Sequence, residues 1–159
     1  MIILSIDPGF GRMGVAIIEK KDRGSKEVLL YSACFETSAK DTIYDRFLQV
    51  GQEVARVIAE YHPEVLAMEN LFMTNNQKTV MDVSQARGIV IYEAKRAGMR
   101  IVEYTPPQIK VAITGYGSAD KSQVYTMVKK LIMLDDRKRI DDEVDAIAVG
   151  LTAFAHLRI

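Results

Sequence analysis

The chain has little of several features that would point to other classes of protein. Its 159 residues contain one cysteine, Cys34, and only two histidines. A single cysteine excludes an intramolecular disulfide, and no Cys/His cluster has the spacing of a zinc site. No apolar run reaches the roughly 18 residues that a membrane-spanning helix requires. We therefore expect neither redox chemistry, nor structural zinc, nor insertion into a membrane.

A sorting signal and an excess of charge are also missing. The first residues, MIILSIDPG, have neither the basic flank nor the small-residue cleavage site of a secretory signal, so we expect a cytoplasmic protein. The formal net charge is +0, from 21 basic and 21 acidic residues. Overall charge thus gives no argument for a polyanionic partner, and a nucleic-acid surface would have to come from local clustering of basic residues.

What the chain does contain is typical of one globular domain. Hydrophobic residues make up 48% and charged residues 26% of the sequence, without internal repeats or low-complexity segments. A length of 159 residues is enough to enclose one substantial core. We predict a single domain spanning residues 1–159.

Hydrophobic periodicity predicts alternating strands and helices. Continuous or alternating apolar runs, bounded by turn residues, indicate strands at 1–7, 15–20, 27–35, 63–70 and 99–104. Apolar residues at helical spacing indicate helices at 41–62, 79–97, 108–115, 119–132 and 142–157. The first three strands form an antiparallel meander, and the others join by helical crossovers. We predict an α/β fold with a five-stranded mixed sheet of order 3-2-1-4-5 and helices on both faces.

Four acidic residues stand where this topology could bring them together. Asp7 and Glu69 end two predicted strands that should be neighbours, and Asp142 and Asp145 lie one turn apart near the start of the last helix. Each has an ordinary structural explanation too. Asp7 could be a turn former, Asp142 a helix N-cap, and Asp145 a first-turn residue favoured by the helix dipole. Glu69 is harder to explain in this way, because unpaired buried glutamates are rare.

If all four carboxylates converge, they cannot all remain ionised unless cations neutralise them. Mg²⁺ meets this need, because it prefers oxygen ligands and keeps open positions for water and phosphate oxygens. A pair of such ions can assist hydrolysis of a phosphodiester bond. Spacing alone leaves Asp141 as an alternative to Asp142, since residues 141 and 145 are also one turn apart.

Four blocks of sequence, in order and almost from end to end, resemble the RuvC family of Holliday junction resolvases. The blocks are IDPGFGRMG, MENLFM, TPPQIKVAITGYGSADKSQV and DDEVDAIAVGLTA. The resemblance implies an RNase H-like fold and a Mg²⁺-dependent endonuclease with two ions in each site, for which Mn²⁺ can substitute. It also implies products with a 5′-phosphate and a 3′-hydroxyl. The implied metal-binding and catalytic residues are Asp7, Glu69, Asp142 and Asp145, and this comparison selects Asp142 over Asp141.

The resemblance also implies how the chain contacts DNA. Phe72 matches an aromatic residue that contacts bases near the crossover, where it would stack on unpaired bases. Lys110 and Lys121 match basic positions close to the DNA, and they would offset the repulsion between the carboxylates and a phosphate. Lys78, Arg87 and residues 136–139 are further basic candidates. The expected partners are a four-way DNA junction, a second copy of the chain and branch-migration proteins.

Other functions remain as alternatives. A related RNase H-like nuclease could process structured RNA, although Phe72 and the KSQV block favour the junction enzyme. A non-catalytic junction-binding protein would not need all four acids. The first hairpin also resembles the phosphate-binding hairpin of actin-like ATPases and sugar kinases, but those proteins enclose a nucleotide between two such domains.

Overall fold

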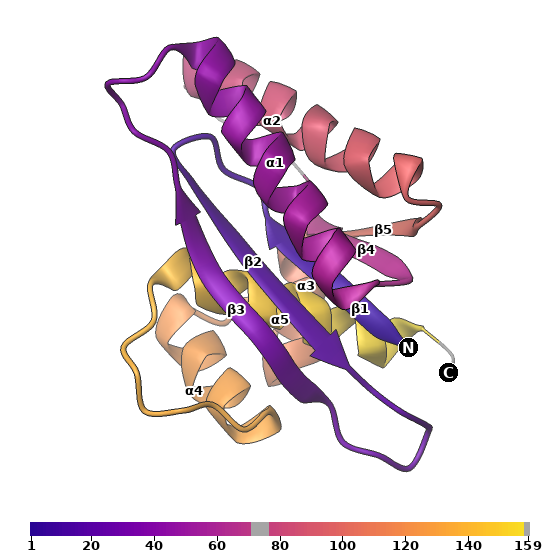
Figure 1. The fold of residues 1–159 in the computed structure, drawn as a ribbon. Helices are drawn as coiled ribbons and strands as arrows, with labels where there is room; N and C mark the ends of the chain where they lie inside the picture. The colour runs from indigo at the N-terminus through magenta and orange to yellow at the C-terminus, as the bar shows by residue number, and fades with distance from the viewer. Residues whose placement is uncertain (71–76, 158–159) are drawn as a thin grey trace.

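The apolar segments at the start of the chain form three antiparallel strands, followed by alternating helices and strands (Figure 1). The computed structural model describes residues 1–70 and 77–157. The elements, in chain order, are β1 (Ile2–Asp7), β2 (Arg12–Glu19), β3 (Val28–Glu36), α1 (Ile43–Tyr61), β4 (Val65–Glu69), α2 (Gln77–Arg96), β5 (Arg100–Tyr104), α3 (Pro106–Thr114), α4 (Lys121–Leu131) and α5 (Asp141–His156).

The five strands make one mixed sheet of order β3-β2-β1-β4-β5, which confirms the predicted topology. β1 pairs antiparallel with β2, and β2 pairs antiparallel with β3. β4 runs parallel to β1 on one side and to β5 on the other. The chain direction therefore switches at β1, and the carboxyl ends of β1, β4 and β5 meet at one edge of the sheet. Ligands in open α/β sheets gather at such an edge.

Helices cover both faces of the sheet, as predicted. α1 and α2 lie over one face, while α3, α4 and α5 lie over the other (Figure 1). Side chains of a strand point alternately to the two faces. Accordingly Leu4 and Ile6 pack in the core beneath α1 and α2, whereas Ile3 packs in the core beneath α5. The central strands β1 and β4 are buried on both sides, which explains why their sequences are continuous apolar runs rather than alternating ones.

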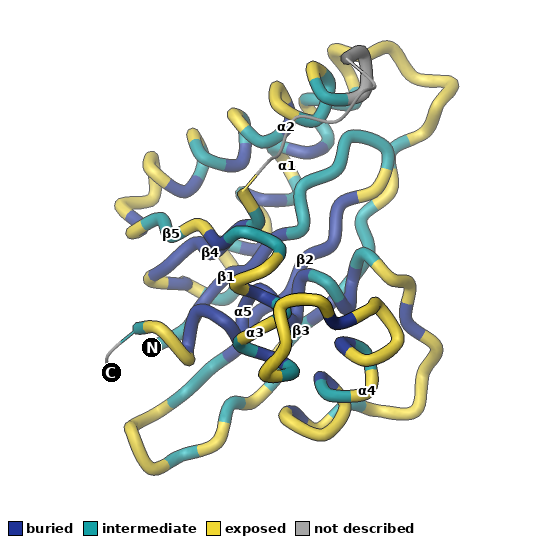
Figure 2. Tube along the Cα trace, turned by 180° about the vertical axis from the view of Figure 1, so that it is seen from behind, coloured by how far each residue is buried: buried dark blue, intermediate teal, exposed yellow. Residues whose placement is uncertain are grey.

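α5 is the most deeply buried helix and lies directly on the sheet (Figure 2). Its residues from Ala146 to Phe154 are all buried. Gly150 permits this close approach, because a Cβ atom there would come within 2.6 Å of Ser5 Oγ on β1. The position of α5 relative to β1 is therefore fixed by tight packing, and its first two turns lie near the end of β1. Across the described residues, none of the helices combines the length and apolarity needed to cross a bilayer.

Local signals set where α3 and α4 begin. Thr105 and Asp120 cap α3 and α4, each in a capping box with a glutamine three residues later. α3 starts at Pro106, two residues before the predicted start, because proline fits the first turn of a helix. Lys110 and Lys121 consequently have fixed places, one in the middle of α3 and the other at the first residue of α4.

Candidate functional site

The ends of two parallel strands bring the first two predicted acids together. β1 ends at Asp7 and β4 ends at Glu69, and the pairing of Ile6 with Met68 sets the two strand ends side by side. Burial of the apolar residues before them fixes the register, so each carboxylate emerges where its strand leaves the core. The strand-end prediction is confirmed for the backbone positions of Asp7 and Glu69.

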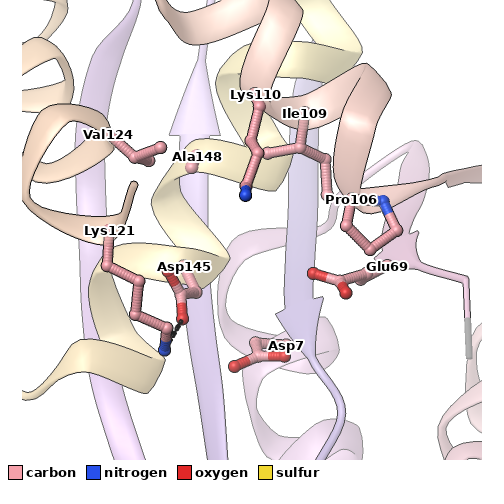
Figure 3. A pocket seen from close by; sticks show the side chains of 9 residues that line it. All are labelled: Asp7, Glu69, Pro106, Ile109, Lys110, Lys121, Val124, Asp145 and Ala148. Atoms are coloured by element: carbon pink, nitrogen blue, oxygen red, sulfur yellow. Dashed lines mark hydrogen bonds and ion pairs between the residues drawn. The ribbon is translucent and has the colours of Figure 1, made fainter. Parts of the chain in front are cut away.

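α5 adds a third carboxylate from the other side. Its axis passes so close to β2 that the carbonyl oxygen of Asp142 lies against Gly14, and Gly14 is the residue paired with Asp7. Asp145 is located one turn further along the helix and faces the space above Asp7. Three segments that are distant in sequence therefore each supply one acid, and their carboxyl groups turn towards a common space (Figure 3).

That space is a cavity of about 310 Å³ at the carboxyl edge of the sheet. It has an acidic part, a basic part and an apolar wall contributed by α3, α4 and α5 (Figure 3). Its lining residues are Asp7, Glu69, Pro106, Ile109, Lys110, Lys121, Val124, Asp145 and Ala148. Of the predicted site residues that the structure describes, Asp7, Glu69, Asp145, Lys110 and Lys121 are therefore in one cavity.

The surroundings of the three acids in the cavity disfavour their ionised forms. Burial and the negative charges of Asp145, Glu69 and Asp142 raise the pKa of Asp7 to about 7. Burial, together with repulsion from Asp145, also raises the pKa of Glu69. Burial raises the pKa of Asp145 as well, although Lys121 opposes this shift. Buried like charges with perturbed pKa values are typical of functional sites, because a protein otherwise avoids their cost.

Two lysines supply positive charge to the cavity from α3 and α4. The Nζ atom of Lys121 is 3.2 Å from Oδ2 of Asp145, and this ion pair raises the pKa of Lys121 (Figure 3). Lys110 lies on the opposite side, where its charge favours the ionised form of Glu69. Both predicted lysines thus face the acids instead of lying on an unrelated solvated surface.

The donor set of the cavity fits a hard divalent cation. Carboxylate oxygens are the ligands that Mg²⁺ prefers, and a bound cation would relieve the repulsion that raises the three pKa values. Within residues 1–70 and 77–157, however, no three His, Cys, Asp or Glu side chains are grouped closely enough to hold a metal ion as they stand. The carboxylates would therefore have to draw closer around the ion, and Asp145 would have to exchange Lys121 for it.

Asp142 departs from the predicted arrangement. It is absent from the cavity lining, and its Oδ2 atom lies 3.3 Å from Nε of Arg12. It is not the N-cap either, because the cap position is Ile140 and the helix begins at Asp141. The first turn of α5 directs this side chain towards β2, where it meets Arg12. The convergence of four acids is thus realised for three of them, while Asp142 still contributes to the repulsion on Asp7.

Several other basic residues have structural partners. Arg137 and Arg139 both bind the buried carboxylate of Glu143, which also accepts a hydrogen bond from Ser32 Oγ at 2.5 Å. The expectation that residues 136–139 contact DNA is therefore wrong for Arg139, whose side chain is only 4% exposed. Arg87 is paired with Glu103. Phe72, and the side chain of Lys78, lie outside the described residues.

Sequence reasoning did not single out Arg12 or Glu143. The signal for Glu143 is its spacing of four from Arg139, which allows an ion pair where a helix begins. The signal for Arg12 is its place on β2 two residues before Gly14, because residues two apart on a strand point to the same face. Arg12 therefore faces α5, as Gly14 does.

Comparisons with known proteins show which family the chain resembles. A family model described as crossover junction endodeoxyribonuclease RuvC matches residues 3–153. The chain is 39% identical over 151 residues to the protein of that name from Halothermothrix orenii, which covers 95% of this chain and 90% of that protein.

Two solved structures of Thermus thermophilus RuvC are also similar to the chain. The structure of the protein has a TM-score of 0.88 and 30% sequence identity. The structure of its complex with a Holliday junction substrate has a TM-score of 0.90 and 29% identity. In both, the match covers 97% of this chain and 93% of the other.

Proposed function

The chain belongs to the RuvC family of crossover junction endodeoxyribonucleases, and from this membership we propose that it resolves four-way (Holliday) DNA junctions. The reaction is metal-dependent hydrolysis of phosphodiester bonds, with symmetric nicks in two strands. The observation that carries the proposal is the cavity at the carboxyl edge of the sheet, in which Asp7, Glu69 and Asp145 face Lys110 and Lys121. The structure of the T. thermophilus relative has been solved with a Holliday junction substrate, and the match covers 97% of this chain.

We infer that Asp7, Glu69 and Asp145 hold two Mg²⁺ ions, with Asp142 as a fourth ligand and with Mn²⁺ able to replace Mg²⁺. When bound, the ions neutralise developing charge and activate water for attack on phosphorus. The chain itself supplies three carboxylates whose raised pKa values reflect burial and mutual repulsion. Since a cation removes that repulsion, metal binding and ionisation of the three acids favour each other.

Lys110 and Lys121 make the acidic cavity accessible to DNA. A phosphate would be repelled by three or four carboxylates unless positive charge stood beside them. Lys110 faces the cavity from α3, and Lys121 is able to leave Asp145 for a phosphate because its side chain is 75% exposed. Phe72, three residues after Glu69, is proposed to stack on bases near the crossover.

The protein is proposed to act as an isologous dimer, because two identical sites related by a two-fold axis match two strands of like polarity in a junction. α2 supports this proposal, since Met81 and Tyr92 on that helix are more than 60% exposed. On the neighbouring α1, Tyr44 and Leu48 are exposed as well. Sedimentation equilibrium at micromolar concentration should give a dimer, and monomer alone would contradict this assignment. Branch-migration proteins are the expected further partners.

One comparison of substrates tests the proposed function. The purified protein is incubated with a four-way DNA junction, a linear DNA duplex of the same sequence and a structured RNA, each with Mg²⁺ or with chelator. We expect paired nicks in the junction that require the metal, with little cutting of the duplex or the RNA. Equal cutting of the RNA would favour the RNA-processing alternative, and junction binding without metal-dependent cutting would favour a non-catalytic protein.

A further inference from the structure

Two cations from other parts of the chain each hold one of the α5 carboxylates. Lys121 holds Asp145 at 3.2 Å, and Arg12 holds Asp142 at 3.3 Å. The two pairs differ in their consequence, because Asp145 lines the cavity and Asp142 does not. Of the four predicted acids, the one that pairs with Arg12 is thus the one that does not line the cavity.

The pair between Arg12 and Asp142 leaves the carboxylate only partly satisfied. The Oδ2 atom of Asp142 is buried, yet it has no hydrogen-bond partner among the described residues. The nearby guanidinium of Arg12 attracts it electrostatically without donating an aligned hydrogen bond. Burying a carboxylate oxygen without a hydrogen bond costs free energy, so a partner that bonds this atom with better geometry would stabilise it.

Arg12 is placed to exchange its partner as well. Its side chain is 57% exposed, whereas that of Asp142 is 25% exposed. Arg12 begins β2 and lies two residues before Gly14, the residue paired with Asp7, so it stands beside the acidic edge of the sheet. An exposed guanidinium binds a phosphate through two parallel hydrogen bonds, which an off-line contact to one carboxylate oxygen does not equal.

We propose that Arg12 is a latch that couples DNA binding to completion of the metal site. In the free protein Arg12 holds Asp142 away from Asp7, Glu69 and Asp145. A backbone phosphate of the junction takes over the guanidinium, and the released carboxylate joins the other three as a metal ligand. The complete ligand set thus assembles when a phosphate is present to be cut. This inference rests on the proposed function, and it assigns to Arg12 a positioning role within that site.

The simpler alternative is that Arg12 only neutralises the acidic first turn of α5. Removing Arg12 would then change metal affinity through charge alone, whether or not Asp142 is present. A latch acts through Asp142. Removing Arg12 must therefore leave metal affinity unchanged in a protein whose residue 142 cannot bind metal. By linkage, a latch released by DNA also makes junction and metal strengthen each other's binding.

The proteins to compare are the wild type, Arg12→Gln, Asp142→Asn and the double variant. Lys26→Gln is the matched control, because it removes one positive charge from the exposed loop between β2 and β3, at the far end of β2 from the site. Affinity for Ca²⁺, a divalent probe that prefers oxygen ligands, is measured by calorimetry without DNA. Junction affinity is measured by fluorescence anisotropy in chelator and in Ca²⁺, and a denaturing gel verifies that the junction stays intact.

We expect Arg12→Gln to bind Ca²⁺ more tightly than the wild type, by roughly two- to fivefold, since an ion pair of this exposure contributes little more. The same substitution should have no effect on Ca²⁺ affinity in the Asp142→Asn background. Ca²⁺ should strengthen junction binding more in the wild type and in Lys26→Gln than in Arg12→Gln. In chelator, Arg12→Gln should bind the junction more weakly because it lacks the phosphate contact.

Equal gains in Ca²⁺ affinity with Asp142 and with Asn at position 142 would overturn the latch and leave only a charge effect. The same Ca²⁺ enhancement of junction binding in Arg12→Gln and wild type would also overturn it. Cleavage of the junction by the wild type in Mg²⁺ is scored in parallel. If that cleavage is absent, the proposed function itself is contradicted. If cleavage is present but Ca²⁺ strengthens junction binding equally in Arg12→Gln and wild type, only the latch is contradicted.

Discussion

The carbonyl oxygen of Asp142 packs directly on Gly14, so that a Cβ atom at residue 14 would come within 1.8 Å of it. This contact joins the first turn of α5 to β2 at the point where β2 pairs with Asp7. Because glycine has no side chain, α5 can approach β2 closely at residue 14. This close approach sets the distance between Asp7 at the end of β1 and the acids of α5.

Gly14→Ala is expected to push the start of α5 away from the sheet. Inserting a methyl group where backbone already stands typically costs about 1–3 kcal/mol. We expect a lower free energy of unfolding, measured with urea, and a larger loss of cleavage than of junction binding. Gly24→Ala is the control, because the nearest atom to a Cβ there is 3.5 Å away, in the side chain of Asp22. A variant at position 14 with wild-type stability and turnover would contradict this account of the packing.

Asp7→Asn is expected to abolish cutting while preserving junction binding, and to change how stability depends on pH. Folding raises the pKa of Asp7 from 3.8 to about 7, so the folded protein holds this proton more tightly than the unfolded chain. Without metal, the contribution of Asp7 to stability is therefore full below about pH 4 and is lost as the pH rises towards 7.

The measurement is urea unfolding of wild type and Asp7→Asn in chelator at pH 5 and pH 8. The wild type should lose stability relative to the variant on going from pH 5 to pH 8, and Mg²⁺ at pH 8 should restore it in the wild type only. A stability difference that is constant between the two pH values would show that Asp7 is not in a strained, repulsive site. Substantial Mg²⁺-dependent cleavage by Asp7→Asn would overturn its assignment as a metal ligand.

The carboxyl edge of the sheet was predictable because it follows from topology. Parallel strands end together, so Asp7 and Glu69 had to meet once their segments were recognised as neighbouring buried strands. Asp145 was expected at this edge as well, because the resemblance grouped it with Asp7 and Glu69 as an implied metal-binding acid. Lys110 and Lys121 followed from the same resemblance, and their helices are held by capping boxes that the sequence displays.

The partners of the charged residues were not predictable in the same way. Glu143 stands in the acidic run DDEVD and looks solvated, yet the fold buries it against Arg137 and Arg139. Asp142 has the spacing of a ligand, but its side chain pairs with Arg12, which is 130 residues away in the chain. Helical spacing predicts which residues share one face of a helix. It does not predict which oppositely charged side chain from another strand will lie against that face.

Phe72→Ala is expected to bind the junction but to cut it poorly. Stacking of a base on an aromatic ring contributes roughly 1–3 kcal/mol, which the variant would lose where bases are held apart. A junction carrying 2-aminopurine at the crossover reports this directly, since unstacking raises its fluorescence. Wild type and Asp7→Asn should both raise the signal, and Phe72→Ala should raise it less. Unchanged fluorescence and turnover in Phe72→Ala would refute the stacking role.

Glu143→Gln is expected to destabilise the protein and to weaken metal binding, although residue 143 does not reach the cavity. The buried carboxylate of Glu143 anchors the first turn of α5 to β3 through Ser32 and to the preceding loop through Arg137 and Arg139. Removing its charge leaves the buried guanidinium of Arg139 with less compensation, and breaking a buried ion pair typically costs about 3 kcal/mol or more.

Asp135→Asn is the matched control for Glu143→Gln. Asp135 also pairs with Arg139, but its side chain is 64% exposed, and exposed ion pairs contribute at most about 1 kcal/mol. Urea unfolding should therefore separate the two variants clearly. Because Asp142 and Asp145 flank residue 143 on the same turn, Glu143→Gln should also require more Mg²⁺ for half-maximal cleavage, while junction binding in chelator is retained. If Glu143→Gln matched Asp135→Asn in both stability and Mg²⁺ requirement, the first turn of α5 would be held by its packing against Gly14 alone.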